Sequence, residues 1–210
     1  GCVSLFQAFK KKGYTTVNYG SYIPGYPGKF VGLDQREGVR LGLELLKKHG
    51  HHRIVFLINE PREIGVVGPR LEAFLKLRKE FGLKEATVHD CNLPNWEDSY
   101  AASIKAMPKI MAAKPAPPAI FGVSGIGACG ALKWLLQNNI AVPEQGAVFG
   151  YDDVPGSELM HPALTSLSHP AGELASHAIE TLWETDPLTP TFEVRPPTLL
   201  ERESVGPAKV

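Results

Sequence analysis

The sequence lacks the features that a membrane protein or a disulfide-bonded secreted domain requires. No apolar run approaches the ~20 residues that span a bilayer. The three cysteines, Cys2, Cys91 and Cys129, are odd in number and form no CxxC pair. In the first thirteen residues the positive charges follow the apolar residues, which is the reverse of a secretory signal. We therefore expect a reduced, cytoplasmic setting.

The chain also lacks net charge and recognisable catalytic motifs. Acidic and basic residues balance at 22 each, so the total charge indicates neither nucleic acid nor an anionic membrane as a partner. No GxSxG, HExxH, P-loop or Cys–His signature is present, so we predict no enzyme and no catalytic residue. The neighbours His51 and His52 do not share a face and have no further ligand at metal spacing, so we predict no metal site.

What the chain does contain is a regular alternation of predicted strands and helices. Apolar β-forming runs alternate with segments whose apolar residues recur at helical spacing. This order predicts an α/β fold with a mostly parallel sheet in three α/β/α layers. Helices are expected at 3–12, 35–49, 69–81, 96–113 (with a break before Pro108), around 125–137 and at 171–184. Strands are expected at 15–18, 30–33, 53–58, 86–91, 119–123, 147–151 and 164–168, followed by an extended segment at 192–202.

The stretch from Pro117 to Pro155 is the clearest unit, because it reads as strand, glycine-opened helix and strand. In a parallel sheet, ligands bind beyond the carboxyl ends of the strands. Ser124 and Asp152 stand at two such ends and are the first candidates for a binding site. Of the acidic neighbours Asp152 and Asp153, we expect one to bind a ligand hydroxyl and the other to cap the turn, since adjacent residues point in different directions.

The glycines at 125, 127 and 130 match GxGxxG, which occurs in dinucleotide-binding proteins. The motif follows a strand and opens a helix, and Asp152 ends the next strand as a ribose-binding acid would. However, three strand–helix units precede it, whereas the fingerprint normally opens its domain. We favour the alternative, a small-residue helix start that packs closely on the sheet, and predict no cofactor.

Three further residues stand near strand ends, and each has a structural alternative. Asp34 either caps its helix or binds a ligand hydroxyl. Arg70 either faces solvent or uses its planar donor group on a ligand. Trp96 either belongs to the core or stacks on the apolar face of a sugar ring. The topology would gather these residues, with Asn18, on one rim of the sheet.

Several segments resemble the lactose-repressor/galactose-repressor family of transcription regulators. They agree with it in order and spacing from about residue 13 to 204. The segments are GLDQREGVRLGLELLKKHGHHRIVFL, GPRLEAFLKLRKEFGL, PPAIFGVSGIGACGALKWLLQNNIAVPEQGAVFGYDD, HPALTSLSHPAGELASHAIETL and PPTLLERES.

The resemblance implies a fold like that of a type I periplasmic sugar-binding protein, with two subdomains that close over a small effector such as a sugar or nucleobase. The N-terminal subdomain, here incomplete, would comprise 1–58 and 169–190, and the C-terminal one 59–168 and 191–210. Chain crossings would lie near Asn59, Ser168 and Pro190. The family also implies a homodimer that binds operator DNA through an N-terminal helix-turn-helix, which precedes this chain in the truncation we expect. By position, the effector contacts would be Asp34, Arg70, Trp96, Ser124 and Asp152, with Asn18 and Tyr19.

One departure from the family concerns the site itself. The family usually has Asn-Asp or Cys-Asp where this chain has Ser124-Gly125, so a long amide and an acid are missing there. The effector is therefore expected to be unusual, or the pocket partly disabled. Two other functions remain open on the sequence, which are a periplasmic sugar-binding protein of a transporter and an NAD-dependent enzyme that uses Gly125 to Gly130.

Overall fold

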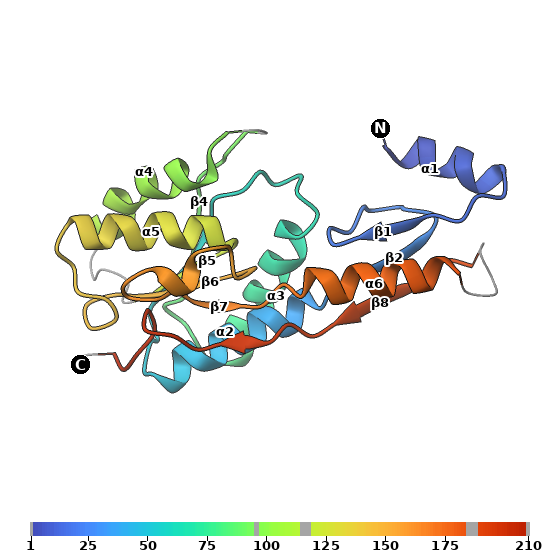
Figure 1. Ribbon diagram of the computed structural model, residues 1–210. Coiled ribbons are helices and arrows are strands. Elements are labelled where there is room, and N and C mark those ends of the chain that lie inside the picture. Colours follow the sequence, from blue (N-terminus) through green and yellow to red (C-terminus); the bar gives the residue numbers. More distant parts are fainter. Residues whose placement is uncertain (1, 95–96, 114–118, 184–188, 209–210) are drawn as a thin grey trace. The chain divides into compact units, whose positions relative to one another are not determined.

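The computed structural model describes residues 2–94, 97–113, 119–183 and 189–208, in which strands and helices alternate (Figure 1). The helices are α1 (Cys2–Lys11), α2 (Gln35–Lys48), α3 (Val67–Glu80), α4 (Ser99–Ala112), α5 (Gly125–Gln137), the short 3-10 helix η1 (Ser157–Leu159) and α6 (Ala171–Leu182). The strands are β1 (Val17–Tyr19), β2 (Lys29–Leu33), β3 (Ile54–Ile58), β4 (Thr87–Asp90), β5 (Ala119–Gly122), β6 (Ala147–Gly150), β7 (Thr165–Leu167), β8 (Phe192–Arg195) and β9 (Leu199–Leu200). The predicted α/β class is confirmed.

The chain divides into two compact units. The larger unit, Gln35–His169 with Thr198–Val210, holds a six-stranded sheet of order β4-β3-β5-β6-β7-β9. All its strand pairs are parallel except β7 with β9. Successive residues of a strand point to opposite faces. Phe56, Phe121 and Phe149 therefore join the core under α2 and α3, whereas Ile120 and Val148 join the core under α4 and α5.

The smaller unit comprises Gly1–Asp34 and Pro170–Pro197. Its three strands are parallel in the order β1-β2-β8. Val31 and Leu33 of β2 pack against Leu174 and Ala178 of α6 in a small separate core. The sheet is thus completed by a strand, β8, that lies more than a hundred residues later in the chain.

The structure places the division between the units elsewhere than the sequence predicted. Residues 35–58 belong to the larger unit, because α2 packs beside α3 and β3 lies between β4 and β5. Residues 191–197 belong to the smaller unit, because β8 pairs with β2. The chain therefore passes from unit to unit after residues 34, 169 and 197, and not at Asn59 or Pro190.

The expected break before Pro108 is wrong, since α4 continues through Pro108 to Ala112. A proline removes one backbone hydrogen bond from a helix and crowds the preceding turn. The neighbouring residues Ala106, Met107 and Ile110 are buried against α5 and the sheet, and this packing holds the helix together across the missing bond.

Candidate functional site

Arg70, in the first turns of α3, is only 2% exposed and makes several hydrogen bonds within the larger unit. Its Nε donates to Gln35 Oε1 at 2.7 Å, and its Nη1 donates to the backbone oxygen of Val123 at 2.6 Å. Its two terminal nitrogens also donate to the Asp152 carboxylate at 3.3 and 2.8 Å. The Cζ of the guanidinium lies over the Tyr151 ring, 3.7 Å from its centroid. Nearly all its N–H groups are thus used within the protein.

Asp152 follows β6 at the carboxyl end of the sheet, with a left-handed φ of 71° that Asp tolerates better than most residues. Burial raises the pKa of this carboxyl, but the interactions with the His169 imidazole and the Arg70 guanidinium outweigh it and lower the pKa to about 2. The His169 Nδ1 lies 3.8 Å from Oδ1. With this pKa the carboxylate is ionised at neutral pH, and the Arg70 contacts hold it in place. Because 29% of the side chain is exposed, it is still open to a ligand hydroxyl.

Ser124 is placed at the end of β5 as predicted, but its hydroxyl already has a full set of partners. It caps α5 by accepting from the Gly127 N–H at 3.3 Å, and it accepts from Asn59 Nδ2 at 3.0 Å. It donates its proton to Glu60 Oε1 at 2.7 Å. A hydroxyl has one proton and two lone pairs. Ser124 therefore organises the rim and has little capacity left for a ligand.

The three glycines of the GxGxxG pattern are explained by close packing. A Cβ at Gly125 would lie 2.1 Å from the backbone oxygen of Tyr151, and one at Gly127 would lie 2.1 Å from the Asn59 side chain. At Gly130 a Cβ would lie 2.6 Å from the Tyr100 backbone oxygen. Each glycine thus lets a neighbouring segment approach the start of α5, as the favoured interpretation of the motif required.

The predicted contacts of the smaller unit lie in or directly after its strands. Asn18 is half-buried in β1, and its Oδ1 has no hydrogen-bond partner among the described residues. Tyr19 is 40% exposed and donates its hydroxyl proton to the Ala171 backbone oxygen at 3.2 Å. Asp34 follows β2, and its backbone N–H donates to the Arg195 oxygen at 2.8 Å. Trp96 lies outside the described residues.

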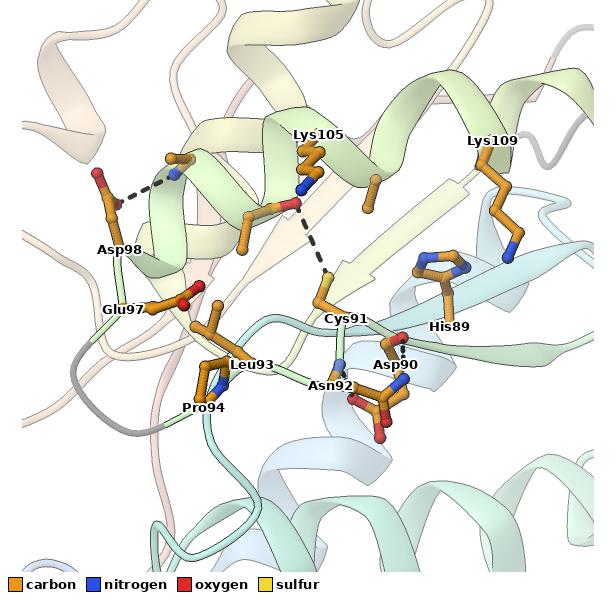
Figure 2. Close-up of a pocket in the computed structure, with 13 residues that line it drawn as sticks. His89, Asp90, Cys91, Asn92, Leu93, Pro94, Glu97, Asp98, Lys105 and Lys109 are labelled. Atoms are coloured by element: carbon orange, nitrogen blue, oxygen red, sulfur yellow. Dashed lines mark hydrogen bonds between the residues drawn. The ribbon is translucent and has the colours of Figure 1, made fainter.

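A separate cavity of about 540 Å³ lies between β4, α4 and the connection that joins them (Figure 2). Its acids are largely in use, because Asp90 pairs with Arg62 at 2.6 Å and Asp98 caps α4 by accepting from two backbone N–H groups. Burial raises the pKa of the Cys91 thiol on its wall to about 11, which keeps that thiol protonated and unreactive. The exposed Lys105 and the half-buried His89 also line the cavity, together with the apolar side chains of Leu93, Pro94 and Ala106, so its lining mixes polar and apolar groups.

Sequence reasoning missed two residues of the rim. His169 was not selected because a single histidine after a strand carries no pattern, yet it contacts Asp152. Glu60 was not selected because it lies in a loop, yet it joins the ends of β3 and β5 to the start of α4. The useful signal was the dipeptide Asn59-Glu60, an amide and an acid directly after the strand that neighbours Ser124.

The described part of the chain contains no helix long and apolar enough to cross a membrane. Within the same residues, no group of three or more His, Cys, Asp or Glu side chains is arranged to hold a metal ion.

Comparison with known proteins gives consistent matches. The family model for the periplasmic binding protein-like domain matches residues 43–205. The HTH-type transcriptional regulator GalS of Salmonella typhimurium is 30% identical over 190 residues, which cover 88% of this chain and 54% of that protein. This chain thus spans about half the length of the curated relatives it matches.

Two solved structures extend the match to the fold. A LacI family transcriptional regulator from Enterococcus faecalis with bound ribose is similar with a TM-score of 0.81 at 19% identity, covering 100% of this chain and 75% of that one. A complex of the transcriptional regulator CelR with cellobiose has a TM-score of 0.72 at 26% identity, covering 90% of this chain and 58% of that one.

Proposed function

Because the chain belongs to the periplasmic binding protein-like domain family, we propose that it is the effector-sensing part of a transcription regulator. The resemblance to the lactose-repressor/galactose-repressor family is confirmed, since the relatives include GalS, GalR and PurR. The ligand that we propose is a small sugar or a similarly polar molecule. This fits CelR, whose solved complex contains cellobiose. The setting that we propose is the cytoplasm.

The observation that carries the proposal is the Arg70–Asp152 pair at the carboxyl end of the six-stranded sheet. Ligands of open α/β sheets bind at this end. Asp152 stands there with a left-handed φ of 71°, and non-glycine residues in this region are enriched at binding sites. Its carboxylate is held by two hydrogen bonds from Arg70 before any ligand arrives, which lowers the entropic cost of binding.

The roles of the predicted residues differ in this proposal. Asp152 accepts ligand hydroxyls, whereas Arg70 chiefly holds Asp152 in position. Ser124 stabilises the start of α5. Asn18, Tyr19 and Asp34 of the smaller unit, and Trp96, remain predicted contacts. The effector would act by favouring one arrangement of the regulator over another, which changes how a homodimer presents its DNA-binding segments to the operator.

Isothermal titration calorimetry tests this proposal with D-ribose, D-galactose, D-glucose, cellobiose, adenine and hypoxanthine. At least one compound should bind, and Asp152→Asn should weaken that binding at least tenfold, because a charged acceptor is replaced by a neutral amide. Asp153→Asn is the matched control, since Asp153 pairs with Arg202 at 2.7 Å and should not contribute to the affinity. Equal binding by wild type and Asp152→Asn would refute the assignment of the site.

The two other functions are less well supported. The NAD-dependent enzyme rested on Gly125, Gly127 and Gly130, whose lack of a side chain is explained by packing. A transporter's periplasmic binding protein shares the fold, but the relatives named above are transcription regulators.

A further inference from the structure

Glu60, directly after β3, is held in place at the rim of the larger unit. Its Oε1 accepts from the Ser124 hydroxyl at 2.7 Å, and its Oε2 accepts from the Ser99 hydroxyl at 2.7 Å. Ser124 caps α5 and Ser99 is the first residue of α4, so the carboxylate lies against two helix N-termini, where negative charge is favoured. The side chain is half-buried, so part of it remains accessible.

The polar cluster around Glu60 contains more acceptor capacity than donor groups. Asn59 is fully buried and turns its Nδ2 toward Ser124 at 3.0 Å and toward Glu60 at 3.4 Å. The Asn59 Oδ1 has no hydrogen-bond partner in the described part of the chain. Each carboxylate oxygen of Glu60 can also accept more than it does. A ligand that completes this cluster therefore has to bring hydrogen-bond donors.

Three arginines near strand ends of the larger unit are already paired with acids. Arg70 pairs with Asp152, Arg202 with Asp153 and Arg62 with Asp90. Within the described residues, Glu60 has no cationic partner. An anionic group on a ligand would therefore meet the Glu60 carboxylate while these three arginines are occupied with other acids and do not compensate for the repulsion.

From these observations we propose that Glu60 is a second effector-binding carboxylate, which selects neutral or amine-bearing sugars and rejects sugar phosphates and sugar acids. This inference rests on the proposed function, and it names the class of ligand. Glu60 thereby supplies, from the end of β3, an acid of the kind that the sequence lacks at Ser124-Gly125 after β5, and the buried Asn59 donates to it.

The test compares matched ligands by calorimetry on wild type and Glu60→Gln. The sets are D-ribose with D-ribose 5-phosphate, and D-glucose and D-galactose each with its 2-amino and 6-phosphate derivatives. On wild type, the phosphate ester of any sugar that binds should bind at least about a hundredfold more weakly than the sugar. Glu60→Gln should weaken the binding of the parent or amino sugar about tenfold, because a charged acceptor contributes about that much affinity. It should also lower the ratio of the affinity for the sugar to the affinity for its phosphate ester at least tenfold.

Glu63→Gln is the matched control, because Glu63 is exposed in the same connection and the substitution removes the same charge. It should leave both affinities and their ratio unchanged. Glu60→Asp, which keeps the charge, should retain the rejection of phosphate and covers the case in which Glu60→Gln folds poorly.

The inference is overturned if wild type binds a phosphate ester as tightly as its parent sugar, or if Glu60→Gln leaves the ratio unchanged. If a neutral sugar binds through Asp152 but is indifferent to Glu60, this inference fails and the proposed function stands. If no compound of either panel binds, both fail.

Discussion

Replacement of Asp152 by Asn should destabilise the larger unit at neutral pH, and the loss should disappear in acid. Asn tolerates the left-handed φ of 71° as well as Asp does, so the substitution removes the charge without adding backbone strain. The Arg70 guanidinium would then remain buried at 2% exposure without its anionic partner. Loss of one member of a buried pair is costly because the other charge stays desolvated.

The magnitude follows from the pKa of Asp152, which is lowered from the ordinary 3.8 to about 2. This difference corresponds to about 2 kcal/mol of folding free energy. Because the folded-state pKa is the lower of the two, the contribution is fully present above pH ~4 and is lost as the pH falls toward ~2. Asp152→Asn does not titrate at this position, so the stability difference from wild type should shrink by about 2 kcal/mol over that range.

Urea unfolding at pH 7, 5, 4, 3 and 2.5 measures this difference directly. Glu63→Gln corrects for the change in net charge, because it removes one negative charge from an exposed site in the same unit. A stability difference that is absent at pH 7, or that stays constant down to pH 2.5, would show that the Arg70–Asp152 pair does not hold this rim together.

Three further predictions concern other parts of the larger unit, and the first of them has its control variant in the smaller unit. Gly127→Ala should lower the free energy of unfolding by about 1–3 kcal/mol in chemical denaturation, because its Cβ would meet the Asn59 side chain. Gly172→Ala, in the first turn of α6 with no atom of a described residue nearby, should be neutral or stabilising, and equal effects of the two variants would contradict the packing. Burial lowers the pKa of His51, so the stability that its neutral form provides is present above pH ~6.5 and lost as the pH falls below it. The free energy of unfolding of His51→Gln should therefore depend less on pH between 7 and 5 than that of wild type. An unchanged pH dependence would count against burial as the cause. Cys91, with its pKa raised to about 11, should react with iodoacetamide at pH 8 about a hundredfold more slowly than a free thiol. Mass spectrometry of the labelled peptide measures this rate, and rapid labelling would mean that the thiol is not shielded.

The elements of the fold were predictable from local patterns, because apolar runs and helical spacing reflect which face of each element is buried. The strand from 147 and the helix from 125 appear where the sequence places them. The division into units was not predictable in this way. The apolar stripe of α2 shows that one face is buried, but not whether the partner is α3 or the strands of the smaller unit.

The placement of the candidate residues relative to the strands was predictable, but the partners of their side chains were not. Ser124 and Asp152 follow β5 and β6 as predicted, and topology alone brings the ends of parallel strands to one edge. Arg70 donates its hydrogen bonds to Asp152, and Ser124 donates its proton to Glu60. Both pairings depend on side-chain geometry between residues more than fifty positions apart in the chain. In the described part of the chain, Glu60 contacts the candidate residues only through its hydrogen bond from Ser124, which no sequence pattern encodes.

A crystal structure of the protein with its tightest-binding sugar tests the central claim most directly. The account predicts a sugar hydroxyl within hydrogen-bond distance, about 2.6–3.2 Å, of an Asp152 carboxylate oxygen, with the Arg70 pair intact. A sugar seated instead in the cavity between β4 and α4, with Asp152 free of contact, would contradict it.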